Sequence, residues 1–169
     1  MKLIRFLFFA LSLVALASCG EKSKFLTYNG PNVTQIVVLK EQRTMHLMHN
    51  DRRLKTYKFD LGFAPRGDKK VEGDGKTPEG VYFIDRRNPD SRFHLSVGIS
   101  YPNEADRAEA AALGESPGGD IFIHGRGPFY NIKKNRKDDW TWGCIAVSDR
   151  EVEEIYSMVK TGTQIVIKP

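Results

Sequence analysis

The chain has 169 residues, of which 26 are Lys or Arg and 21 are Asp or Glu, so its formal charge is +5, and 40% of its residues are hydrophobic. These values indicate one globular domain and exclude disordered, collagen-like and repeat-built chains. The basic excess is small and contains no long block of Lys or Arg, so we expect no nucleic-acid partner.

Residues 1–18 have the pattern of an export leader. Lys2 and Arg5 precede an uncharged run, residues 6–17, that is shorter than the roughly 20 residues needed to cross a bilayer. The stretch LASC, which ends at Cys19, resembles the bacterial lipobox and implies lipidation of that cysteine. The alternative is an ordinary secretory signal cut near Ser18. Both interpretations predict an exported protein.

A lipid on Cys19 would leave Cys144, the second of only two cysteines, as a lone thiol. The residues that follow Cys19 lack an aspartate at the second position, which resembles sorting to the outer membrane of a Gram-negative host. We therefore expect a signal peptide at 1–18, a lipidated N-terminus and tether at 19–32, and a catalytic domain at 33–169, in the periplasm and anchored by lipid. An unpaired thiol in an oxidising compartment suggests reactive chemistry, although a buried inert cysteine is the alternative.

Along the domain, short β-branched or alternating segments predict strands. They are residues 33–40, 43–49, 54–62, 81–85, 93–99, 121–124 and a last strand in 163–168. The stretch 64–80 is rich in Gly, Pro, Lys and Asp and indicates a loop.

Two helices are expected among these strands. The Ala- and Glu-rich stretch 104–113 predicts the first, with Gly114 as its stop. Ser148 and Glu151 form a capping box that starts the second, whose apolar face continues to Val159 before Gly162. Many short strands with one or two helices predict a mainly β fold, either a sandwich or a partly closed barrel.

Residues 121–147 carry the candidate chemistry. His124 ends an apolar strand and is followed by Gly125, which places an imidazole at an open rim. Cys144 follows Gly143, and a thiolate is the nucleophile that an imidazole within reach can generate. Backbone amides near Gly143 and Cys144 are candidates for holding an oxyanion.

Two motifs then identify a family. His124-Gly125 followed by Thr141-Trp142-Gly143-Cys144, and the earlier segment 77–83 (TPEGVYF), resemble the L,D-transpeptidase catalytic (YkuD) domain. The resemblance covers roughly residues 33–168. It implies a sandwich-like β fold of mixed sheets with one or two short helices, and action on the peptidoglycan bond between diaminopimelate and a terminal D-alanine.

In that family Cys144 corresponds to the nucleophile and His124 to the general base, whose second nitrogen is oriented by a backbone carbonyl. Gly143 and Cys144 match the oxyanion positions. The thioester is resolved by an amine, which gives a cross-link or attaches a protein, or by water, which gives carboxypeptidase activity. The partners implied are peptidoglycan stem peptides and a wall-attached lipoprotein, and no cofactor is implied.

This sequence departs from the family pattern at two positions. Trp142 stands where many members have His, and Ala146 stands where Arg or Asn is common. We consider Arg126 and Trp140 as parts of a replacement substrate site, with surface charge and core packing as the alternatives. Gly125, Thr141 and Trp142 complete the predicted substrate contacts, and Thr141 either orients or merely caps the cysteine loop.

Other polar residues have simpler interpretations. We expect solvated or core histidines at positions 46, 49 and 94 rather than metal ligands. His46 and His49 are three residues apart on a predicted strand, so they point to opposite faces and cannot share a metal ion. The basic run 133–137 (KKNRK) is either a solvated loop or a contact for anionic wall polymers.

Two further functions stay open besides the transpeptidase. One is a hydrolase, either an L,D-carboxypeptidase or an amidase-like enzyme that releases a wall-linked protein. The other is a wall-binding module without activity, which would have no evident need for His124 and Cys144.

Overall fold

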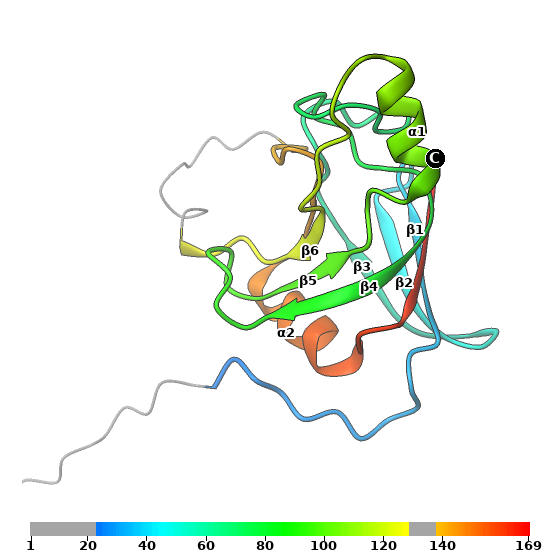
Figure 1. The fold of residues 1–169 in the computed structure, drawn as a ribbon. Coiled ribbons are helices and arrows are strands. Elements are labelled where there is room, and N and C mark those ends of the chain that lie inside the picture. The colour runs from blue at the N-terminus through cyan, green and yellow to red at the C-terminus, as the bar shows by residue number, and fades with distance from the viewer. Residues whose placement is uncertain (1–22, 129–137) are drawn as a thin grey trace, which may run out of the picture.

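The computed structural model describes residues 23–128 and 138–169, and within these ranges the chain forms one curled sheet with two helices (Figure 1). The predicted leader, Cys19 and the basic run 133–137 lie outside the described residues. The described elements are β1 (Gln35–Leu39), β2 (Thr44–His49), β3 (Arg52–Lys58), β4 (Gly80–Asn88), β5 (Ser96–Ile99), α1 (Glu104–Ala112), β6 (Phe122–His124), β7 (Ile145–Ala146), α2 (Asp149–Met158) and β8 (Gln164–Lys168).

The strands follow the order β3-β2-β1-β8-β4-β5-β6-β7. The pairs β1–β8 and β6–β7 are parallel, and the other neighbouring pairs are antiparallel. Beyond β3, Asp60 forms an isolated bridge with Ala146 of β7, and Gly62 forms another with Thr141. These bridges join the two ends of the sheet, so the predicted mainly β, mixed-sheet fold is confirmed and takes the form of a nearly closed barrel.

The core lies inside this curl. Alternate residues of β1, Ile36 and Val38, are fully buried, as are Val152 and Ile155 of α2. Removing such side chains from water contributes about 1.5–3 kcal/mol each. Helix α2 packs on β5 and β6, whereas α1 stands at the other end of the sheet (Figure 1). The packing of α2 therefore supports the strand that ends in His124.

The capping box of α2 is confirmed. The Ser148 hydroxyl accepts from the Glu151 amide, and the Glu151 carboxylate accepts from the Ser148 amide at 2.9 Å. The end of this helix was predicted too late: it ends at Met158, and Val159 is its C-cap with extended torsions. Because Val159 is fully buried, the chain has already turned into the core before Gly162.

Some strand boundaries also differ from the prediction. The third strand ends at Lys58, since residues 60 and 62 leave it to bridge the other end of the sheet. The fifth begins at Ser96, after His94 adopts a φ of +75° that no extended strand contains. The two-residue strand β7 was not predicted. No helix within the described residues is long and apolar enough to cross a membrane.

Candidate active site

His124 is the last residue of β6 and is almost fully buried. Its Nδ1 lies 2.5 Å from the backbone carbonyl oxygen of Gly125. A carbonyl only accepts hydrogen bonds, so Nδ1 must carry a proton, and in the neutral ring the lone pair then sits on Nε2. The backbone thus selects the tautomer that a general base requires.

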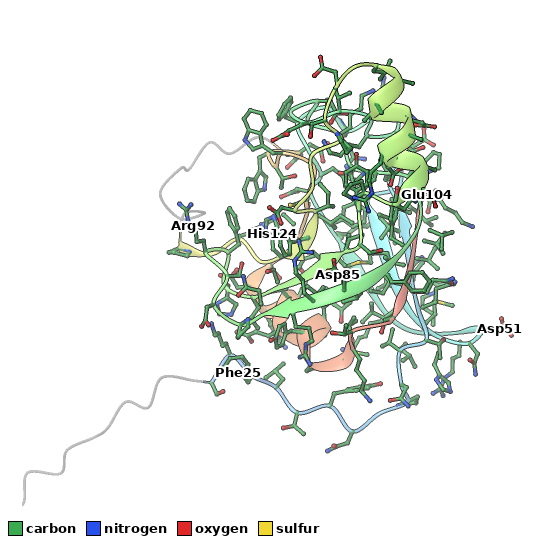
Figure 2. All side chains as sticks on the ribbon, viewed as in Figure 1. Phe25, Asp51, Asp85, Arg92, Glu104 and His124 are labelled. Carbon is green, nitrogen blue, oxygen red and sulfur yellow. The ribbon has the colours of Figure 1, made fainter. Side chains whose placement is uncertain are left out.

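Two aromatic rings hold this imidazole. Phe93 stacks on it with ring centroids 4.5 Å apart, and Trp140 meets it at a steep angle with centroids 5.7 Å apart. Figure 2 shows His124 beside β6, within a dense group of side chains. The two aromatic rings therefore restrict the orientation of the imidazole.

Cys144 directly precedes β7. In the parallel register His124 pairs with Ala146 and Ile123 with Ile145, so Cys144 lies level with Phe122. This register gives an expected Cα separation of about 8 Å between Cys144 and His124. The two candidate catalytic residues, twenty positions apart in sequence, are therefore brought close together by the pairing of β6 and β7.

The Cys144 thiol is partly exposed and donates to the backbone carbonyl of Asp120 at 3.5 Å. Burial raises its pKa from 9.0 to about 11, and the negative charge of Asp120 adds to this effect. The Phe122 amide, Lys69 and Arg86 oppose the rise without reversing it. The resting residue is thus a thiol, and its reaction requires a base to remove the proton.

The loop before the nucleophile is fixed by two threonines. Thr141 Oγ1 donates to the Cys144 carbonyl at 2.7 Å and accepts from the Gly143 amide at 3.2 Å. Thr77 Oγ1 donates to the Gly143 carbonyl at 2.8 Å. Thr141 therefore orients the loop, and Gly143 would have to exchange its hydrogen bond with Thr141 before its amide could hold an oxyanion.

Gly143 has a φ of +120°, which side-chain-bearing residues avoid. A Cβ at this position would lie 2.5 Å from the Lys76 carbonyl oxygen. The nucleophile is thus preceded by a position that both torsion and space restrict to glycine.

Arg126 and Trp140 meet at a carboxylate that the sequence did not single out. Asp60 Oδ2 accepts from Arg126 Nη2 and from Trp140 Nε1, both at 3.1 Å. Asp60 therefore gives Arg126 a carboxylate partner within the protein itself, and the two side chains form an internal ion pair. The Trp140 ring contacts the His124 ring, so this tryptophan has a packing role and also forms part of the site.

Asp149, the first residue of α2, holds the turn that follows His124. Its Oδ1 accepts from the Arg126 amide at 2.7 Å and the Gly127 amide at 2.8 Å. This carboxylate also packs against Gly125, where a Cβ would lie 2.5 Å from Oδ1. Helix α2 therefore positions the loop whose carbonyl orients the histidine.

The two departures from the family pattern lie in different surroundings. Trp142 is 71% exposed and packs edge-on against Phe63, with ring centroids 5.0 Å apart. Ala146 is fully buried and its backbone exchanges two hydrogen bonds with Asp60, each 2.9 Å long. Trp142 is thus available to a ligand, whereas Ala146 belongs to the closure of the sheet.

Sequence reasoning missed several residues that build the site: Thr77, Asp60, Phe93, Asp120 and Asp149. The motif at 77–83 and the capping box at 148–151 were signals for Thr77 and Asp149. No local pattern marks the others, because their partners are distant in sequence.

The remaining histidines lie apart. His46 contacts Thr56 Oγ1, His49 contacts the Asn32 carbonyl, and His94 contacts Glu153. Across residues 23–128 and 138–169, no three His, Cys, Asp or Glu side chains are grouped to hold a metal ion.

A cleft of about 730 Å³ opens beside the C-terminal residue Pro169. It reaches Asp60, but its lining includes neither Cys144 nor His124. The candidate chemistry therefore lies outside this cleft.

Comparison with known proteins gives a consistent result. The family model of the L,D-transpeptidase catalytic domain (YkuD) matches residues 33–167. The Escherichia coli K12 protein named "Putative L,D-transpeptidase YafK" is 31% identical over 140 residues, which are 79% of this chain and 50% of that protein. The chain thus spans about half the length of the curated relatives it matches.

Solved structures show the same fold. The helical cell shape determining protein Pgp2 of Campylobacter jejuni is 27% identical, with a TM-score of 0.63 over 88% of this chain and 52% of that one. An L,D-transpeptidase of Mycobacterium smegmatis is 16% identical, with a TM-score of 0.53 over 81% of this chain and 59% of that one. At that identity the second likeness concerns the fold alone.

Proposed function

The chain belongs to the L,D-transpeptidase catalytic domain (YkuD) family, and we propose that it is an acyltransferase that acts on peptidoglycan stem peptides through a thioester on Cys144. The observation that carries the proposal is the pairing of β6 and β7, which places Cys144 close to the strand that ends in His124, whose Nδ1 contacts the Gly125 carbonyl. This geometry supplies a nucleophile and a base in the required tautomer.

In the first half of the reaction, His124 Nε2 takes the thiol proton while Cys144 Sγ attacks the carbonyl carbon at the L-centre of diaminopimelate. The tetrahedral intermediate collapses when its bond to the D-alanine nitrogen breaks and His124 returns the proton to that nitrogen. D-Alanine leaves and a thioester remains on Cys144. The raised pKa of Cys144 makes this proton transfer a necessary part of the attack.

In the second half, an acceptor attacks the thioester and gives its proton to His124; the C–S bond breaks, and His124 passes the proton to the departing Cys144 thiolate. An amine from another stem peptide yields a cross-link, and an amine on a protein attaches that protein to the wall. Water yields a shortened stem peptide and makes the enzyme an L,D-carboxypeptidase. An amidase-like cleavage of a protein-to-peptidoglycan bond would use the same thioester.

We further propose that the protein is exported and anchored by a lipid on Cys19, so that residues 33–169 work in the periplasm. The leader pattern at 1–18 supports this proposal. Residues 23–32 run along the domain surface below α2, where Lys24 Nζ donates to the Pro89 carbonyl at 2.6 Å (Figure 1). The tether is therefore partly docked on the domain.

A role in cell shape is a second proposal at the level of the organism. Its support is the 27% identity to Pgp2 over most of this chain. Shortening stem peptides or cross-linking them alters the wall, so either outcome of the thioester is compatible with such a role.

The test is intact-mass spectrometry of the protein incubated with purified tetrapeptide muropeptides, followed by product analysis. We expect a thioester adduct that maps to Cys144, together with release of D-alanine. Cys144→Ala should abolish the adduct, whereas Ser157→Ala, near the C-terminal end of α2, should retain it. Turnover by the Cys144→Ala protein would refute the nucleophile assignment, and absence of both adduct and D-alanine from the unaltered protein would refute the reaction in favour of a binding role.

A further inference from the structure

Three charged side chains beside the nucleophile neither transfer a proton nor form a bond in the reaction proposed above. They are Asp85 and Arg86 of β4 and Asp120, which precedes β6, and we term them the charged trio. Asp85 is labelled in Figure 2. Arg86 Nη1 donates to Asp85 Oδ2 at 2.7 Å, and Nη2 donates to Asp120 Oδ1 at 2.9 Å. Because the Cys144 thiol donates to the Asp120 carbonyl, one end of the trio adjoins the nucleophile.

Arg86 reaches Asp120 because β5 leaves a gap in its path. In the register of β4 and β5, Arg86 is opposite Gly98. A Cβ at position 98 would lie 2.6 Å from Arg86 Cγ and 2.6 Å from Asp85 Oδ1. The guanidinium crosses this glycine and stands 4.5 Å from the ring centroid of Phe122 on β6. Three neighbouring strands therefore cooperate to bring a cation to the edge of the active site.

The trio is open to solvent. The side chain of Asp120 is 89% exposed and that of Arg86 42%. Ion pairs at this exposure contribute only about 0–1 kcal/mol to stability, so stabilising the fold is a weak reason for the arrangement. Asp120 also has a φ of +55°, a region that few side-chain-bearing residues occupy.

We propose that the charged trio is a subsite for a zwitterionic amino acid head, in which an ammonium and a carboxylate are attached to one carbon. The D-centre of diaminopimelate has this chemistry, so the inference rests on the proposed function and adds recognition to it. The Arg86 guanidinium donates to the ligand carboxylate, and the carboxylates of Asp120 and Asp85 accept from its ammonium. The trio has two carboxylates and one guanidinium, so it offers at least one group of opposite sign to each charge of the zwitterion.

The D-centre can belong to the donor stem or to the acceptor stem, and kinetics separate the two. Acylation of Cys144 by a tetrapeptide reports on the donor. Loss of the preformed thioester on addition of a diaminopimelate tripeptide, compared with water alone, reports on the acceptor. Each measurement is repeated with lysine in place of diaminopimelate, because lysine keeps the ammonium and lacks the carboxylate.

The variants are Arg86→Gln and Asp120→Asn, the second of which tolerates the left-handed backbone. We expect Arg86→Gln to lower the rate with diaminopimelate about 10- to 100-fold in one of the two steps and to leave the rate with lysine nearly unchanged. Asp120→Asn should lower the rates with both peptides in that step. Arg87→Gln is the matched control, because Arg87 turns away to the Tyr156 ring, 4.0 Å from its centroid. The preference is the ratio of the rate with the diaminopimelate peptide to the rate with the lysine peptide. If this ratio is the same in the unaltered protein and in all variants, for both steps, the proposal is overturned.

A binding measurement separates this proposal from the proposed reaction. Affinities of the two tripeptides for the Cys144→Ala protein, measured by calorimetry with and without Arg86→Gln, need no catalysis. A diaminopimelate preference of about tenfold or more that Arg86→Gln removes supports the subsite even if no thioester forms. A preference that survives Arg86→Gln, or no preference at all, would overturn it even in an active enzyme.

Discussion

The raised pKa of Cys144 predicts how its reactivity depends on pH. With a pKa of about 11, the fraction of thiolate at pH 7 is about one in ten thousand, compared with about one in a hundred for a thiol at 9.0. Alkylation by iodoacetamide proceeds through the thiolate. The rate at Cys144 should therefore rise about tenfold for each pH unit between pH 7 and 10, without a plateau in this range.

The assay is peptide-level mass spectrometry of the full chain after timed alkylation, which reads Cys144 separately from Cys19. His124→Gln should leave the profile almost unchanged, because the resting thiol is not held as an ion pair with the imidazole. Asp120→Asn should move the rise to lower pH, although only in part, since burial is the larger cause. Substrate acylation should fall much less steeply than alkylation as pH decreases, because His124 removes the proton during attack.

A plateau of appreciable alkylation below pH 7 that disappears in His124→Gln would refute this reasoning. Such a plateau is the signature of a thiolate paired with an imidazolium. It would mean that the interaction with His124 outweighs the burial of the sulfur.

Three further predictions concern the scaffold of the site. Thr77→Val should lower the free energy of unfolding, measured with urea, by about 1–3 kcal/mol and should slow acylation, because the buried Gly143 carbonyl loses its hydrogen-bond partner. Thr77→Ser should restore both the stability and the acylation rate. An equal loss of stability in the two variants would contradict the role of the hydroxyl. Gly143→Ala should lower the free energy of unfolding by more than Gly73→Ala, for which a loss of about 1 kcal/mol is expected. Both positions have a positive φ, but only a Cβ at position 143 would make a 2.5 Å contact. Equal shifts of the melting temperature in the two variants would argue against that contact. Asp149→Ala should lower stability by about 1–3 kcal/mol and reduce acylation, because the Arg126 and Gly127 amides lose their acceptor. Asp149→Asn keeps an acceptor for both amides and should lose less stability in chemical denaturation. A loss of similar size in the Asn variant would instead assign the effect to charge.

Local patterns in the sequence predicted the elements whose stabilising contacts are also local. The capping box at Ser148 involves residues three apart, and the start of α2 was correctly expected from it. The β-branched residues of β1 and β8 predicted their strands from composition, although these two strands pair with each other across 129 positions of the chain. By contrast, β7 consists of two residues that pair with β6 among the described strands, so its pattern is too short to recognise before the fold is known.

The site shows the same division. His124 and Cys144 were predicted from their motifs, and Thr141 was predicted either to orient or to cap the cysteine loop. Arg126 was considered a substrate contact or a surface charge, and its pairing with Asp60, 66 positions away in the chain, was not predicted. No periodicity links residues at such separation, because the contact arises only when the sheet curls.

The closure of the sheet also has a consequence for the order of folding. The bridges from Asp60 to Ala146 and from Gly62 to Thr141 join segments about 80 residues apart, so the entropy of a long loop opposes them and they should form late. The cysteine loop is completed by the same bridges. We therefore expect the thiol to stay reactive throughout refolding until the last barrel contacts close, and the onset of its protection from alkylation to mark the end of folding.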